Sequence, residues 1–141
     1  MQKIHFFSEN IDFDLSESQK ITSWIEKIIV KEGFEVHLLN YIFCNDEYLH
    51  QINVEYLKHD TYTDIITFDN SEKDKTIESD IFISVERVRE NAIKFKTSFE
   101  NELSRVLIHG VLHLLGYPDK SPEEAKIMRQ KEQEALIQLV N

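Results

Sequence analysis

Apolar and polar positions follow two different periods along this chain, and these periods predict its helices and strands. Short runs rich in apolar and β-branched residues predict four strands, at residues 4–7, 36–43, 65–68 and 77–84. Helical spacing of apolar residues predicts five helices, which begin near residues 18, 46, 85, 99 and 122. Because strands and helices are mixed, we expect an α/β (mixed α+β) fold. Its helices should pack on a single small sheet of about four, mostly parallel strands.

Residues that begin or end helices stand at the predicted boundaries. We expect Ser16 or Ser18 to cap the first helix and Asn45 or Asp46 to cap the second, because such side chains accept hydrogen bonds from free backbone N–H groups. Capping serines and stop glycines mark other boundaries, at Gly33, Ser98, Gly116 and Ser121. The chain is thus predicted to be mostly regular structure with short connections.

Length and composition indicate an ordinary globular protein. The chain has 141 residues, of which 41% are hydrophobic and 30% charged, so residues 1–141 are expected to form a single domain. Cys44 is the one cysteine, which rules out a disulfide framework, and its place after an apolar run predicts a buried core thiol. The chain has neither a secretory signal nor a run of roughly 18 apolar residues, so we expect a cytoplasmic protein without membrane contact.

The charge distribution leaves the type of partner open. A formal net charge of −10 argues against binding to nucleic acid, whose phosphates attract cations, unless the local field at the binding surface differs from the average. Acidic residues are dense at 69–80 and 123–134. Basic residues gather at Arg87, Arg89, Lys94 and Lys96. This pattern indicates either an electrically divided surface or a solvated helix face.

Two histidines one helical turn apart are the strongest chemical feature of the sequence. His109 and His113 share a helix face, so their imidazoles can converge on one ion. Gly116 permits a left-handed turn and Pro118 forbids further helix, so the chain can bring Asp119 back as a third ligand. Two imidazoles and a carboxylate suit zinc, and three protein ligands leave a position open for water. We therefore predict a catalytic site for zinc, or another divalent transition metal, at His109, His113 and Asp119.

The predicted metal-binding helix carries a polar stripe on an otherwise apolar surface. The stripe comprises Ser98, Glu102, Arg105, His109, His113 and Gly116. It is either the wall of a metal site or the solvent-facing side of a core helix. Arg105, one turn before His109, is a candidate catalytic residue that would stabilise phosphate charge, and an ion pair with Glu102 is the alternative.

The spacing H-x-x-x-H-x-x-G-x-x-D matches the metal-binding helix of metzincin metalloproteases. In those enzymes the residue after the first histidine is a glutamate that acts as general base. Here that residue is Gly110, which cannot accept a proton. Peptide hydrolysis by the glutamate mechanism is therefore disfavoured. Because the histidine spacing still matches, a relative of the metalloproteases stays an alternative identity for this protein.

The segment HGVLHLLGY, from His109 to Tyr117, resembles the signature H-G-x-L-H-L-x-G-Y/H-D-H of the YbeY-type endoribonucleases. The resemblance continues, in the family's order, over the stretch from Asn53 to Phe68, the segment DIFIS at 80–84 and the last helix. It implies a bacterial, cytoplasmic, zinc-dependent endoribonuclease specific for single-stranded RNA, with rRNA and the ribosome as partners. It also implies a role in maturation of the 3′ end of 16S rRNA and in ribosome quality control.

The chain departs from the family pattern at two positions that concern the chemistry. The family's third histidine falls on Asp119, an oxygen ligand that widens the choice of metal. The family's arginine falls on Leu57, and the adjacent Lys58 and His59 are the candidates for binding substrate. A protein that binds single-stranded RNA also needs aromatic side chains on which the bases can stack. The candidates are Tyr56, Tyr62 and Tyr117.

Three functions are therefore distinguished at the level of sequence. The resemblance implies a metal-dependent endoribonuclease. The spacing of the histidines alone would also allow a metalloprotease-like hydrolase. The third reading is a non-enzymatic, ribosome-associated module in which the metal only orders the end of the helix.

Overall fold

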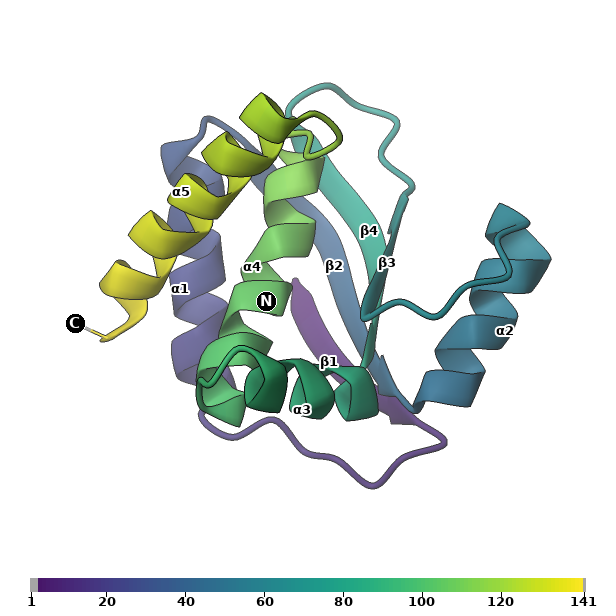
Figure 1. Cartoon of the computed structure of the whole chain (residues 1–141). Helices are drawn as coiled ribbons and strands as arrows, with labels where there is room; N and C mark the ends of the chain where they lie inside the picture. Colours follow the sequence, from purple (N-terminus) through teal and green to yellow (C-terminus); the bar gives the residue numbers. More distant parts are fainter. Residues whose placement is uncertain (1–2, 141) are drawn as a thin grey trace.

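The computed structural model describes residues 3–140, which form one four-stranded sheet flanked by helices (Figure 1). The strands are β1 (Ile4–Glu9), β2 (Glu35–Cys44), β3 (Ile65–Asp69) and β4 (Thr76–Ser84). The helices are α1 (Ser18–Lys31), α2 (Asp46–Leu57), α3 (Val85–Lys94), α4 (Phe99–Leu114) and α5 (Pro122–Val140). The predicted α/β class is confirmed, and each strand extends one or two residues beyond its predicted limits.

The sheet has the strand order β1-β2-β4-β3, so β1 and β3 form its two edges. Strands β1, β2 and β4 are parallel, whereas β3 pairs with β4 in the antiparallel sense. The expectation of a mostly parallel sheet is thus confirmed. In Figure 1, α1, α4 and α5 lie on one side of the sheet and α2 lies on the other. Helix α4 contacts both β3 and β4, which places it beside the antiparallel edge.

The main core lies between the sheet and helices α1, α4 and α5. Leu39, Tyr41 and Phe43 alternate along β2 toward this layer and are almost completely buried. The buried Tyr41 hydroxyl donates a hydrogen bond of 2.9 Å to the carbonyl oxygen of Leu107 on α4. This bond satisfies a polar group that would otherwise be costly to bury, and it fixes α4 against the centre of the sheet.

Hydrogen bonds at the helix ends confirm most of the predicted caps. The side chains of Asn45 and Ser98 each accept from the backbone N–H three residues later, at 2.8 and 3.0 Å. Helix α1 differs, because its N-cap is Glu17, whose φ is 56° and whose side chain makes no capping hydrogen bond. The expected cap by Ser16 or Ser18 is therefore wrong. The apolar face of α1 is buried in the core, and that burial stabilises the helix in place of a side-chain cap.

Cys44 ends β2 in the interior of the protein. Its side chain has no exposed surface, and its thiol donates to the carbonyl oxygen of Ile83 at 3.5 Å. Burial raises the pKa of the Cys44 thiol to about 12, so the thiol is protonated at neutral pH. The prediction of a core thiol is confirmed.

Close packing at Gly110 sets the distance between α4 and the sheet. A Cβ atom built on Gly110 would lie 3.0 Å from the Cδ1 atoms of both Ile65 and Ile81. Glycine therefore suits the close contact with β3 and β4, because a side chain there would push against two isoleucines of the sheet. This contact places the neighbouring residue, His109, at the edge of the sheet formed by β3.

We expect Gly110→Val to destabilise the protein by about 1–3 kcal/mol, because overpacking forces the isoleucines or the helix to move. Gly110→Ala should cost less, since the ends of the two isoleucines can shift slightly and alanine favours helix. Urea unfolding of the metal-free proteins measures both effects. A valine variant as stable as the wild type would contradict this view of the packing.

Candidate metal centre and its cleft

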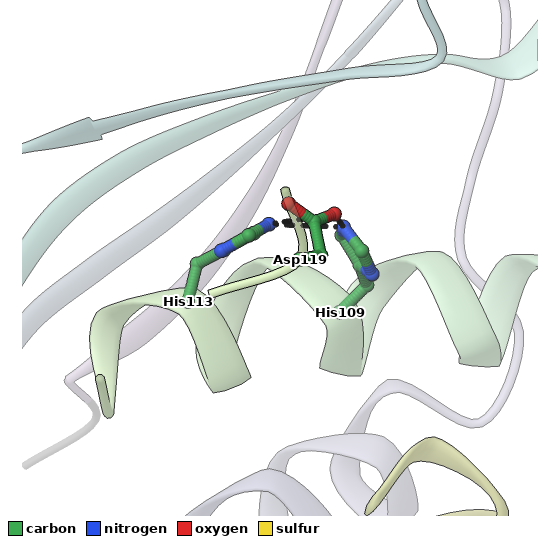
Figure 2. A group of neighbouring side chains, drawn as sticks. All are labelled: His109, His113 and Asp119. Carbon is green, nitrogen blue, oxygen red and sulfur yellow. Dashed lines mark hydrogen bonds and ion pairs between the residues drawn. The ribbon is translucent and has the colours of Figure 1, made fainter. Parts of the chain in front are cut away.

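The three predicted metal ligands lie together, with their donor atoms turned toward one another (Figure 2). The Nε2 atoms of His109 and His113 are 3.1 Å apart. Oδ2 of Asp119 is 3.4 Å from each of these two nitrogens. Two imidazoles and one carboxylate thus form a nearly equilateral triangle that could hold one metal ion.

The size of the triangle suits a small divalent metal. Ligand atoms that surround zinc tetrahedrally at 2.0–2.1 Å are separated from one another by about 3.3–3.4 Å. The separations of 3.1, 3.4 and 3.4 Å are close to this spacing. The ligand side chains are 18–36% exposed, so the open side of the triangle faces solvent. Three ligands with one accessible side are typical of catalytic zinc sites.

The end of α4 shapes the loop that carries the third ligand. Gly116 has a φ of 101°, in the left-handed region, and its N–H donates to His113 O at 3.0 Å. The N–H of Tyr117 donates to Leu112 O, also at 3.0 Å. These two bonds form a Schellman motif, which ends the helix and reverses the chain. The predicted turn after His113 is therefore present, and it returns Asp119 to the helix.

The far side of this loop is fixed by the start of α5. The Ser121 hydroxyl accepts from the N–H of Glu124 at 3.1 Å, and the Glu124 carboxylate accepts from the N–H of Ser121 at 3.0 Å. This reciprocal pair is a capping box. The Tyr117 hydroxyl also donates to Glu32 at 2.8 Å, which ties the loop to the end of α1. Asp119 therefore lies in a short segment with both ends held.

A buried carboxylate supports His109 from behind. Glu132, on α5, lies 2.6 Å from Nδ1 of His109 through one oxygen and 3.1 Å from Nη1 of Arg105 through the other. Glu102 binds the same guanidinium twice, at 2.6 and 3.0 Å. Glu132 was not predicted from the sequence. The signal that could have found it is a glutamate on the apolar face of α5, between Met128 and Leu136.

The polar stripe of α4 therefore does not face solvent throughout. The Glu102 side chain is 2% exposed, and the expected ion pair between Arg105 and Glu102 is formed. The hydrogen bond to Glu102, helped by the charge of Glu132, raises the pKa of the Arg105 guanidinium still further. Arg105 is thus held by two carboxylates behind His109, and it is not among the residues that line the cleft.

A cleft of about 610 Å³ opens over the three predicted metal ligands. One wall is the segment from Leu57 through β3, and the other is formed by His109, His113 and Asp119. The buried Asn53 side chain anchors the first wall, because its amide donates to the Thr61 carbonyl at 2.9 Å and to the Thr61 hydroxyl at 3.2 Å.

The lining of this cleft is polar but not basic. Among the described residues, no lysine or arginine lines it, whereas Asp64, Asp69 and Asp119 do. Of the two predicted substrate-binding residues, His59 lines the cleft and Lys58 does not. The three candidate stacking tyrosines and the basic residues of α3 also lie outside its lining. The Tyr62 hydroxyl instead donates to Glu47 at 2.7 Å.

Comparison with known proteins agrees with this arrangement. The family model described as endoribonuclease YbeY matches residues 3–140. The chain belongs to the endoribonuclease YbeY family. The resemblance noted in the sequence is thereby confirmed. It extends beyond the histidine motif, because the match includes β1, α1 and β2 as well as the metal-binding helix.

Individual YbeY relatives match over most of their length. The endoribonuclease YbeY of Christiangramia forsetii is 54% identical over 134 residues, which are 95% of this chain and 92% of the relative. That of Flavobacterium johnsoniae is 53% identical, over 92% of this chain and 93% of the relative. The solution structure of TM1509 from Thermotoga maritima is similar with a TM-score of 0.68 and 28% identity, covering 96% and 88% of the two chains.

Asp64, just before β3, is a partly buried carboxyl in the lining of the cleft. Burial raises the pKa of Asp64, and the opposing attraction of Arg105 and His109 does not cancel that effect. The backbone carbonyl of Asp64 accepts from Ser84 N–H at 3.0 Å, which holds the residue at the end of β4. From the sequence, Asp64 was part of the stretch that resembles the family, and no role was predicted for it.

We expect Asp64→Asn to raise the melting temperature of the metal-free protein at neutral pH. A carboxyl with a raised folded-state pKa binds its proton more tightly in the folded than in the unfolded protein, so its ionised form costs stability above that pKa. The advantage of the asparagine should therefore shrink as the pH falls through the folded-state pKa of Asp64. Thermal melts across this range test the prediction, and an asparagine variant less stable at neutral pH would contradict it.

Proposed function

We propose that this protein is a metal-dependent endoribonuclease that cleaves single-stranded RNA in the cleft over His109, His113 and Asp119. The observation that carries the proposal is the triangle of three donor atoms, 3.1–3.4 Å apart, in one wall of an accessible cleft. The relatives named endoribonuclease YbeY supply the reaction class. Geometry and family thus support the same chemistry.

The ion is proposed to be zinc. Two imidazole nitrogens and a carboxylate oxygen at this spacing suit it, although a carboxylate also accepts manganese and other divalent ions. A bound divalent metal polarises a phosphodiester oxygen and lowers the pKa of a coordinated water or 2′-hydroxyl. In this scheme His109, His113 and Asp119 hold the ion, and Asp64 is the carboxylate that accepts the proton of the attacking hydroxyl.

Substrate binding is proposed to rest on hydrogen bonds and on the metal rather than on cationic side chains. Because none of the described cleft residues is a lysine or arginine, phosphate charge must be balanced mainly by the ion. His59, Thr61 and Thr63 line the wall opposite the ligands and can donate to phosphate or ribose oxygens. Lys58, exposed at the end of α2, is assigned to the outer rim. Arg105 is assigned to supporting His109 through Glu132 instead of contacting phosphate.

The biological role proposed is maturation of the 3′ end of 16S rRNA and ribosome quality control, in the cytoplasm and in contact with the ribosome. The family resemblance supports this role. Within residues 3–140, no helix is both long and apolar enough to cross a membrane.

The two alternative functions are not favoured. A peptidase of the metzincin type needs a glutamate after the first histidine, and here that position is packed against Ile65 and Ile81 of the sheet. A module in which metal only orders the helix end would not need an accessible cleft over the ligands. The relatives are named for endoribonuclease activity, which neither alternative includes.

We expect the purified protein to cleave single-stranded RNA, to lose this activity in chelator and to regain it with Zn²⁺. Loss of a residue that supports a metal ligand lowers activity by about 10–100-fold. Asp119→Ala should reduce the cleavage rate by more than this, because it removes a ligand itself. Asp64→Asn should bind metal but cleave poorly. Elemental analysis and gel assays of a labelled single-stranded RNA measure these effects.

Asp74→Ala is the matched control, because Asp74 is an exposed aspartate in the loop between β3 and β4. It should retain full activity. Cleavage of casein in place of RNA would favour the peptidase alternative. A chelator that lowers the melting temperature, in a protein that cleaves neither substrate, would favour the non-enzymatic module.

A further inference from the structure

Glu132 has a position that its own helix does not require. It lies on the face of α5 that is otherwise apolar, with Met128, Ala135 and Leu136 buried around it. Its side chain is 5% exposed, yet it carries a carboxylate. Burial of a charge is costly unless the charge is paired, and replacement of buried ion pairs by apolar residues is often neutral or stabilising. Apolar residues in place of Glu132 and its charged partners together would therefore suit the packing of α5 at least as well.

The two partners of Glu132 connect it to the metal ligands. Oε2 lies 2.6 Å from Nδ1 of His109, and Oε1 lies 3.1 Å from Nη1 of Arg105. A carboxylate can only accept, so the proton between Glu132 and His109 belongs to Nδ1. The lone pair of a neutral His109 imidazole is then on Nε2, the atom that faces His113 and Asp119.

We propose that Glu132 is a positioning residue for the metal centre, which fixes both the tautomer and the ring orientation of His109. This inference rests on the function proposed above, because it assumes that His109 is a ligand. Ligating histidines commonly donate their second ring N–H to a carboxylate, and loss of that partner weakens metal binding.

Arg105 and Glu102 hold Glu132 in place. Both carboxylate oxygens of Glu102 accept hydrogen bonds from the Arg105 guanidinium, at 2.6 and 3.0 Å. The remaining nitrogen of Arg105, Nη1, then points at Glu132. The two carboxylates and one guanidinium leave one formal negative charge behind His109 (two negative, one positive). That negative charge makes Nε2 of the His109 imidazole a stronger electron-pair donor toward a metal ion on the opposite side of the ring. Helix α5 thus supports His109 through Glu132, a residue 23 positions later in the chain.

The test compares Glu132→Gln with the matched control Glu134→Gln, which removes the same charge from an exposed position on the same helix. Competition with a chromophoric chelator gives the Zn²⁺ dissociation constant, and Co²⁺ absorption reports ligand geometry. We expect Glu132→Gln to weaken Zn²⁺ binding by about 10–100-fold and to alter the Co²⁺ spectrum. Glu134→Gln should match the wild type in both. Thermal melting of the metal-free variants separates loss of affinity from loss of fold.

A Glu132→Gln protein with wild-type Zn²⁺ affinity and an unchanged Co²⁺ spectrum would overturn the inference, even if its melting temperature fell. In that case the wild type would still bind metal, so the proposed function would stand. A wild type that bound neither ion would instead overturn both.

A measurement on the wild type decides the matter if Glu132→Gln does not fold. Nitrogen-15 NMR of the Zn²⁺-loaded protein should show His109 with a hydrogen-bonded proton on Nδ1 and the metal on Nε2. The reverse assignment, with metal on Nδ1, would overturn the role of Glu132.

Discussion

The close approach of α4 to strands β3 and β4 at Gly110 is the constraint on which the site depends. A Cβ atom at that position would lie 3.0 Å from Ile65 and Ile81, so glycine lets the helix lie this close to the sheet without moving either isoleucine. His109, the residue before Gly110, is then directed to the open edge along β3, and one turn later His113 follows it. The same contact excludes the glutamate that a metzincin peptidase would need. Packing and reaction class are therefore linked through one residue.

The parts of the site that could be predicted are those determined locally. His109, His113 and Asp119 lie within one helix end and the turn that follows it, so spacing and the residues Gly116 and Pro118 were enough. Glu132 and Asp64 could not be found this way, because they reach the site from α5 and from the start of β3 through the fold. The fold class followed from periodicity. The cap of α1 did not, because tertiary burial replaced local capping there.

This acidic protein belongs to a family whose substrate, RNA, is also strongly negative. The net charge is −10, and aspartates line the cleft without any described lysine or arginine beside them. Such a cleft would repel RNA without a divalent ion, so we expect binding of substrate and binding of metal to be coupled. Asp64 lines the same cleft, and because burial raises its pKa, its ionised carboxylate costs stability. As the proposed proton acceptor, Asp64 would thus serve activity at some expense of stability.

The most direct test of the account is a crystal structure of the Zn²⁺-loaded protein with anomalous diffraction at the zinc edge. The account predicts one anomalous peak per chain, about 2.0–2.2 Å from Nε2 of His109, Nε2 of His113 and an oxygen of Asp119, with a further position open to solvent. A peak elsewhere, or a coordination sphere closed by a fourth protein ligand, would contradict it.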